Sequence, residues 1–209
     1  MVSVKAGAYM VTGSGSGLTG TSDGGTFTAS PFQTSQGTFS CRVTAITAVK
    51  AKSIPDQAKV CLMARSSLSS SAAYGAVEIA LNGGGPGVHF QVRPVAGQEG
   101  ASDQHTSNAK QATGLIGGDL ILTNRAAPAV NYLVKPVWLK LTRNGATYTA
   151  FTSLDGQHWA QAGNPETFEA VGVWVGFFVT SHDTGHPIAA TFDQIQGFTP
   201  PTTNVQVGA

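Results

Sequence analysis

Segments of alternating apolar and polar residues, each bounded by Gly, Asn, Asp or Pro, recur along the whole chain. A period of two indicates β-strands that bury one face, whereas no window of about 11 residues carries the 3.6-residue period of an amphipathic helix. We therefore predict an all-β protein, folded as a two-sheet antiparallel jelly-roll sandwich. The predicted strands cover residues 8–12, 26–29, 38–49, 58–65, 74–81, 88–95, 120–123, 137–143, 146–153, 158–161, 171–180 and 188–198.

The clearest turn signal is Asn144-Gly145, because Asn-Gly between alternating segments favours a two-residue hairpin loop. If both residues form the loop, Leu141 lies opposite Tyr148. A second turn at residues 155–156 would extend this hairpin into a meander of three consecutive strands.

Charge and apolar run length argue against nucleic acid and membrane as partners. Only 11% of the residues are charged, the formal net charge is +1, and the 12 Lys and Arg residues are scattered. We expect no binding to nucleic acid, because no basic patch is present. The longest apolar run, residues 170–179, is shorter than the ~20 residues of a membrane-spanning helix, so we expect no membrane insertion.

The length of 209 residues suits a single sandwich domain, which we place at residues 1–199. Residues 97–118 form a Gly-rich stretch longer than the ~12–15 residues at which structureless loops become uncommon, and indicate a functional loop or an assembly arm. Residues 13–25 are most simply a surface loop. Because Pro200-Pro201 stiffens the exit from the last predicted strand, we expect residues 200–209 to project as an extended C-terminal arm that contacts neighbouring chains.

The run WLKLTRNGATYTAFTSLDGQHW at residues 138–159, with VGVWVGFFVTSH and ATFDQI further on, resembles the motifs of a known module. GTFSCRV from residue 37 and AKVCLMARSSL from residue 58 add to the match. The module is the concanavalin-A-like lectin/glucanase (laminin-G-like) β-sandwich that is appended to bacterial secreted and cell-surface proteins. The resemblance implies a concanavalin-A-like fold and an accessory role without catalysis.

Paired catalytic carboxylates are not apparent in the sequence. Glycoside hydrolysis needs two carboxyl groups that face each other. Glu78 is the only acidic residue inside a predicted strand before Asp193, and no second carboxylate lies two or four positions away. We therefore expect that the chain is not an enzyme, does not cleave β-glucans or xylans, and uses no cofactor. The G-x-G-x-x-G pattern at residues 15–20 lacks the following helix that phosphate binding requires, so it indicates a flexible loop.

Two groups of residues are candidate sites. Trp174 and Phe178 share one face of a predicted strand, where they either stack on a sugar ring or pack against neighbouring strands. The second group is His182, Asp183 and His186, which could hold a metal ion, although a loop His beside Asp more often stabilises a turn.

Cys41 and Cys61 lie in successive predicted strands, where hairpin pairing could place them opposite each other. Both stand where the family that the chain resembles usually has Ala or Gly. A cross-strand disulfide and two buried free thiols are both compatible with the sequence.

Two functions from different classes remain. The first is a structural virion-surface protein, a capsid decoration or fibre-associated subunit made in the host cytoplasm, whose partners are its own copies or capsid proteins. It is supported by the single domain, the low charge and the lack of a signal-peptide pattern, from which we expect a complete gene product that begins at Met1. The alternative is a carbohydrate-binding accessory module of a secreted or cell-surface protein, whose partners are glycans.

Overall fold

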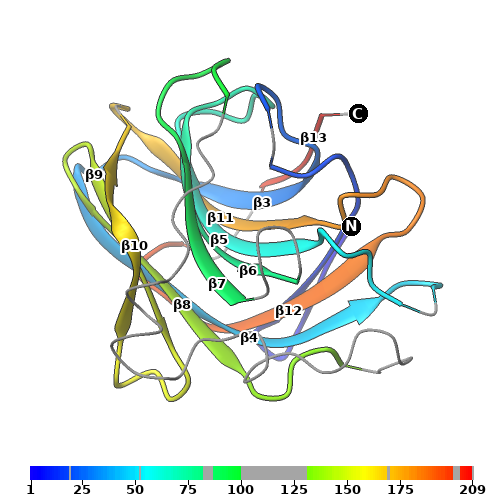
Figure 1. The fold of residues 1–209 in the computed structure, drawn as a ribbon. Coiled ribbons are helices and arrows are strands. Elements are labelled where there is room, and N and C mark those ends of the chain that lie inside the picture. Colours follow the sequence, from blue (N-terminus) through cyan, green and yellow to red (C-terminus); the bar gives the residue numbers. More distant parts are fainter. Residues whose placement is uncertain are drawn as a thin grey trace.

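The computed structural model describes residues 1–18, 20–51, 53–81, 87–99, 131–168, 170–199 and 203–208. These residues form thirteen β-strands in two antiparallel sheets that face each other (Figure 1). The described part of the chain contains no helix, and hence none long and apolar enough to cross a membrane. The predicted two-sheet antiparallel sandwich is confirmed. The predicted strand at residues 120–123, and all of the 97–118 stretch beyond residue 99, lie outside the described residues.

The first sheet has seven strands, in which each strand runs antiparallel to its neighbours. The predicted three-strand meander is confirmed as one edge of this sheet, β8-β9-β10. In spatial order the strands are β1 (Val2–Lys5), β2 (Ala8–Gly13), β12 (Ile188–Gln196), β4 (Gln36–Ala48), β8 (Val137–Asn144), β9 (Thr147–Ser153) and β10 (Ala160–Thr167).

The second sheet has six strands and packs above the first in the view of Figure 1. Its strands are mostly buried on both faces, because one face meets the other sheet and loops cover the opposite face. In spatial order they are β13 (Thr203–Val207), β3 (Gly25–Phe32), β11 (Val173–Thr180), β5 (Lys59–Arg65), β6 (Tyr74–Ala80) and β7 (Gly87–Arg93).

The main core lies between the two sheets and follows the alternation along each strand. On β11, Val173, Val175, Phe177 and Val179 point into this core, as the sequence predicts. Phe177 stacks on Phe192 of the other sheet with ring centroids 4.1 Å apart. Each fully buried side chain of this size contributes about 1.5–3 kcal/mol through the hydrophobic effect, so the inter-sheet contact stabilises most of the fold.

The β8–β9 hairpin has a different register from the predicted one. Asn144 pairs with Thr147, so Gly145 and Ala146 form the two-residue loop, and Leu141 lies opposite Ala150 rather than Tyr148. Gly145 has a φ of +63°. A type II′ turn needs glycine at its first central position, and this requirement moves the turn one residue along the chain.

The prediction that the C-terminal residues project as an extended arm is wrong. Residues 203–207 form β13, which pairs with β3 of the same chain along its full length. Val207 is buried on the sheet, and the hydroxyl of Thr28 donates a hydrogen bond to the side chain of Asn204. The alternation of Val205 and Val207 carries the strand signal that the polar composition of the tail hides.

The possible disulfide between Cys41 and Cys61 is not formed, because both cysteines are free and buried. Cys41 lies on β4 of the seven-stranded sheet and points into the main core. Cys61 lies on β5 of the six-stranded sheet and points away from that core. The two strands are successive in the chain but belong to different sheets, so hairpin pairing cannot bring the thiols together.

Candidate functional site

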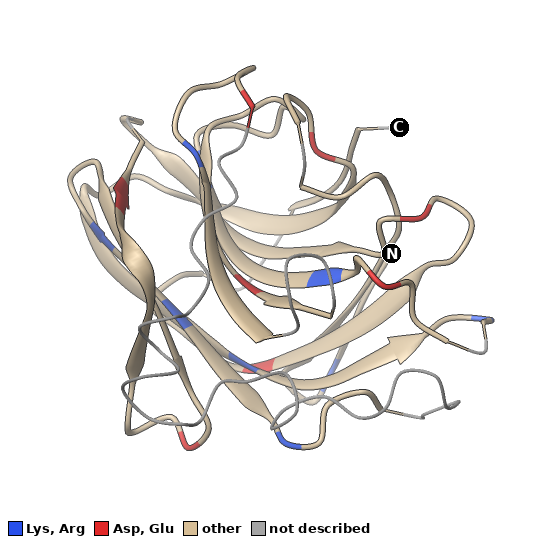
Figure 2. Ribbon diagram, viewed as in Figure 1, with Lys and Arg blue, Asp and Glu red and all other residues tan. Residues whose placement is uncertain are grey.

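The face of the six-stranded sheet that points away from the seven-stranded sheet, here called the distal face, carries an unusual mixture of side chains. A second apolar cluster covers its middle, with Phe27, Met63 and Phe178 at its centre. Charged and polar side chains of β5, β6 and β7 flank this cluster. Charged residues are sparse along the ribbon (Figure 2), and the distal face holds most of those that are buried, namely Asp23, Lys59, Arg65, Glu78 and Arg93.

The β2–β3 loop, described at residues 14–18 and 20–24, closes over the distal face. Leu18 is fully buried against the apolar cluster. Its main-chain carbonyl accepts a hydrogen bond of 2.5 Å from Gln91 Nε2 and one of 3.3 Å from the Tyr74 hydroxyl. Main-chain hydrogen bonds between Gly17 and Gly24 bring the two ends of the loop together. The predicted surface loop is therefore packed into the molecule.

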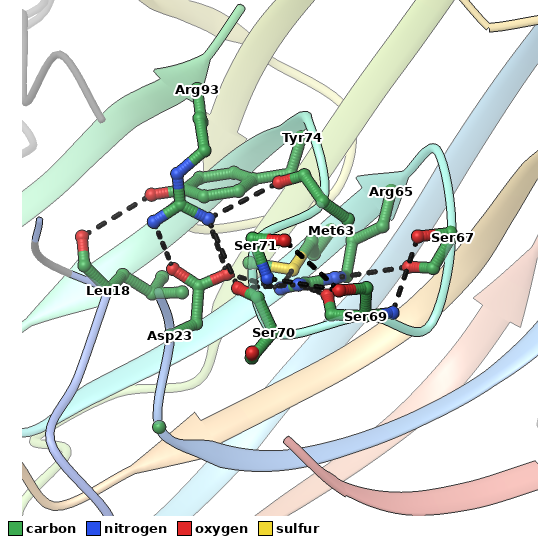
Figure 3. Close-up of polar contacts among 12 residues, drawn as sticks. Leu18, Asp23, Met63, Arg65, Ser67, Ser69, Ser70, Ser71, Tyr74 and Arg93 are labelled. Carbon is green, nitrogen blue, oxygen red and sulfur yellow. Dashed lines mark hydrogen bonds and ion pairs between the residues drawn. The ribbon is translucent and has the colours of Figure 1, made fainter. Parts of the chain in front are cut away.

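Asp23 of this loop lies between two arginines of the distal face (Figure 3). Its Oδ2 is 2.7 Å from Arg65 Nη1 and its Oδ1 is 2.6 Å from Arg93 Nη2. All three side chains have no solvent-exposed surface. The remaining guanidinium donors bond the main-chain carbonyls of Gly20, Ser67, Ser69, Ser70, Ala72 and Gln98. Buried charges are tolerated only when they are paired and hydrogen-bonded in this way.

Tyr74 lies between the two guanidinium groups. The guanidinium carbon of Arg93 is 4.9 Å from the centroid of the Tyr74 ring, and that of Arg65 is 5.7 Å from it. Burial raises the pKa of the Tyr74 hydroxyl, and it lowers the pKa of Arg65. The phenol is therefore protonated and serves as a hydrogen-bond donor.

A second buried pair lies on the same face, with Glu78 one row of residues beyond Gln91 and Lys59 in the following row. Lys59 Nζ is 2.7 Å from Glu78 Oε1 and 2.7 Å from Gln91 Oε1. Glu78 Oε2 is buried and has no hydrogen-bond partner among the described residues. His89 lies beside Glu78 in the next strand. Such an orphaned acceptor is one that a water molecule or a ligand hydroxyl could satisfy.

The structure separates the two aromatic residues that the sequence singles out. Trp174 and Phe178 share one face of β11, as predicted, and this is the distal face. Phe178 is fully buried, and a side chain at Gly25 would collide with its ring, so Phe178 is a packing residue and has no ring face for a sugar. Trp174 is half-buried and lies between Arg65 and Pro31 in the strand register.

The residues suggested as metal ligands do not converge. Asp183 Oδ2 is 2.7 Å from His186 Nδ1, and this hydrogen bond lowers the pKa of Asp183. The ring of His182 instead lies against Gly17 of the β2–β3 loop. Within the described ranges, no three His, Cys, Asp or Glu side chains are placed to hold a metal ion. A pocket of about 360 Å³ is lined by Lys50, Ala51, Ser53, Pro55, Asp183 and His186.

The outer surface of the seven-stranded sheet carries an open polar site. We call it the platform, and define it by Gln36, Thr38, Lys140, Thr142, Asn144, Thr149, Phe151 and Trp159. A groove of about 410 Å³ runs over β4 and β8. It is lined by Gln36, Gly37, Thr38, Thr142, Arg143 and Asn144.

Half-exposed aromatic rings adjoin the groove of the platform. Phe151 lies one residue pair from Thr149 along the outward side of β9, beside Lys140 of β8. The Lys140 ammonium lies 3.9 Å from the ring centroid of Trp159 and 4.6 Å from that of Phe151. Partial burial between these rings lowers the pKa of Lys140. Sequence reasoning missed the platform, although W-x-K-x-T on β8 and T-x-T-x-F on β9 place these groups on one face.

The fold defines the chain as a two-sheet jelly-roll sandwich, and the comparisons with known proteins agree. No protein-family model and no curated protein matches the sequence. The fold is similar to a functionally unknown protein from Saccharomyces cerevisiae, with a TM-score of 0.62 and 13% identity over 97% of this chain and 93% of that one. It is also similar to a xylan β-1,4-xylosidase from Bacillus halodurans, with a TM-score of 0.55 and 12% identity over 90% of this chain.

A third similar structure is Bacteroides ovatus xyloglucan PUL GH43B, with a TM-score of 0.52 and 13% identity over 93% of this chain. The chain spans 33% of the length of this protein and 33% of that of the xylosidase. At these identities the likeness shows the fold alone.

The expectation that the chain is not an enzyme is corrected by this comparison, because the sandwich also occurs in a xylosidase. The expectation of no catalysis was based on the absence of two carboxylates at alternate positions of one strand. In the structure, Asp23 reaches the distal face from a loop, and Glu78 reaches the same face from β6. Loops can therefore assemble acidic groups that no local spacing reveals.

Proposed function

We propose that the protein binds carbohydrate on the platform. The single observation that carries this proposal is the arrangement of an open groove of hydroxyl and amide side chains next to half-exposed aromatic rings on one sheet surface. Sugars present hydroxyl groups around their edge and apolar C–H groups on their faces. Donors and acceptors in one row and rings in the next match both features.

The electrostatics of the platform favour a neutral sugar. Arg42, which borders the platform, is paired with Asp193 through a bidentate contact of 2.7 and 2.8 Å. The ammonium of Lys140 lies against the rings of Phe151 and Trp159. The groove itself is lined by the side chains of Gln36, Thr38, Thr142 and Asn144 together with Gly37 and Arg143, and Arg143 donates its hydrogen bonds to main-chain carbonyls.

The similar folds support carbohydrate as the class of ligand only in so far as they share the sandwich fold. A xylan β-1,4-xylosidase contains this sandwich, and the sequence motifs resemble concanavalin-A-like, laminin-G-like modules. We accordingly propose a secreted or cell-surface protein. The virion-surface reading gains no support from the C-terminal segment, because residues 203–207, which were expected to contact neighbouring chains, form a strand of the chain's own sheet.

A glycan array followed by calorimetry tests the proposal. We expect selective binding of a neutral oligosaccharide to the intact protein. Asn144→Ala removes an exposed amide of the groove, and the loss of about 1 kcal/mol of hydrogen bonding should weaken binding about fivefold. Trp159→Ala should weaken it at least about tenfold, because a stacking surface is lost.

Gln57→Ala is the matched control, because it removes an exposed amide from the connection between β4 and β5, outside the platform. Its affinity should equal that of the unmodified protein. If no glycan binds, or if all three variants bind alike, the platform is not a carbohydrate site.

A further inference from the structure

The groups of the distal face that hold the β2–β3 loop are the groups that would hold a ligand. Arg65 and Arg93 present planar guanidinium donors to one carboxylate, and this geometry is specific for carboxylate or phosphate. Tyr74 and Gln91 each donate to a single carbonyl oxygen. The loop fills this site with an Asp23 carboxylate and a Leu18 carbonyl, so the chain supplies its own acceptors.

The site continues beyond the part that the loop fills. Tyr74 and Glu78 lie four residues apart on β6, about 13 Å along the strand. Glu78 Oε2 is buried without a hydrogen-bond partner in the described part of the chain, although the other carboxylate oxygen is bound to Lys59. An unused acceptor at one end and a carboxylate receptor at the other suit a short chain that bears both hydroxyl and carboxylate groups.

The loop makes only a small apolar contact with the face that it closes. In residues 14–24, SGSGLTGTSDG, Leu18 is the only side chain larger than glycine that is apolar. Gly15, Gly17 and Gly20 have φ values of +139°, +95° and +71°, a region that favours glycine. A ligand carboxylate that replaces Asp23 would restore the same hydrogen bonds to the two arginines. Opening of the loop therefore gives up the apolar contact of one leucine, and its main cost is the loss of the Asp23 ion pairs, which the ligand carboxylate replaces.

From these observations we infer a second ligand site on the distal face, which takes an acidic oligosaccharide and is closed in cis by the β2–β3 loop. The carboxylate of the ligand displaces Asp23 from Arg65 and Arg93, and a ligand hydroxyl donates to Glu78 Oε2. The apparent affinity of such a site is reduced by the small fraction of molecules in which the loop is open. This site is independent of the platform.

The first experiment shifts the loop equilibrium without changing the receptor. Leu18→Ala weakens closure and leaves both arginines intact. We expect it to bind tetragalacturonate at least about tenfold more tightly than the unmodified protein, as measured by calorimetry. Methyl-esterified tetragalacturonate, which lacks the charges, should not bind. Leu154→Ala removes a partly buried leucine from the main core and is the control for general destabilisation.

The second experiment empties the receptor. Asp23→Ala leaves Arg65 and Arg93 without their carboxylate, and sodium acetate should raise the melting temperature of this variant more than sodium chloride at equal ionic strength. If Asp23→Ala does not fold, the Leu18→Ala comparison decides alone. The inference is overturned if Leu18→Ala shows no gain for tetragalacturonate over the control, or if the esterified form binds equally. Asn144→Ala should not change either result, which separates this site from the platform.

Discussion

The sequence around Asp23 suggests an exposed loop residue, but the structure gives Asp23 a buried role. It stands in a Gly- and Ser-rich stretch that is typical of surface loops, yet its carboxylate is buried between Arg65 and Arg93. The two arginines come from strands that pair through β6, and neither is near Asp23 in the sequence. Only the tertiary structure brings the three together, so no local pattern could have revealed the site.

Removal of the charge at Asp23 should strongly destabilise the protein. Asp23→Asn leaves two buried guanidinium groups without a counter-charge, and the loss of one partner from a buried ion pair costs about 3–5 kcal/mol. Asp193→Asn is the matched control, because Asp193 pairs with Arg42 at the surface, where such pairs contribute about 0–1 kcal/mol. Chemical denaturation measures both. Equal losses in the two variants would contradict the structural role of the buried pair.

The turn at Asp155 makes a prediction about pH. Asp155 Oδ2 is 2.7 Å from His158 Nδ1, and this hydrogen bond raises the pKa of His158. The stabilisation from a raised histidine pKa is present below the ordinary value of about 6.5 and is lost as the pH rises through the raised value. In an NMR titration, Asp155→Asn should return the His158 pKa toward its ordinary value. The same titration curve in both proteins would contradict this contact.

At the scale of elements, alternation predicts which residues form strands, but it does not predict which strands pair. The predicted faces of β11 are confirmed, because Val173 to Val179 and Trp174 to Phe178 separate into two apolar clusters. Pairing of β4 with β5 is compatible with the sequence, whereas in the structure the two strands lie in different sheets. Strand order depends on the long connections of the fold, and these carry no periodic signal.

The C-terminal strand offers a test at this scale. Deletion of residues 203–209 removes β13 and exposes the surface that Val207 covers. Loss of the Val207 burial alone costs about 1.5–3 kcal/mol, and Thr26 and Thr28 also lose their side-chain partners. We expect a clear fall in the melting temperature. Val4→Ala, at an exposed position of β1, is the control and should change it little. An unchanged melting temperature after the deletion would mean that β13 does not stabilise the sheet.

At the scale of the molecule, the two sheets present different outer surfaces. The platform is open and mostly uncharged, whereas the distal face is closed by the β2–β3 loop and carries buried charges. The sequence predicts the sandwich because alternation and turn residues are local. It does not predict the platform, because the contributing rows of β4, β8 and β9 become neighbours only through the sheet order.

The most direct test of the account is to map the bound glycan by NMR. With a neutral oligosaccharide selected on the array, we expect shifts in the Thr142 and Asn144 amides and in the Trp159 indole N–H. The amides of Leu18 and Asp23, under the closed distal face, should not shift with this neutral ligand. Shifts that centre on the distal face, with the platform unaffected, would contradict the central claim that the open surface of the seven-stranded sheet binds carbohydrate.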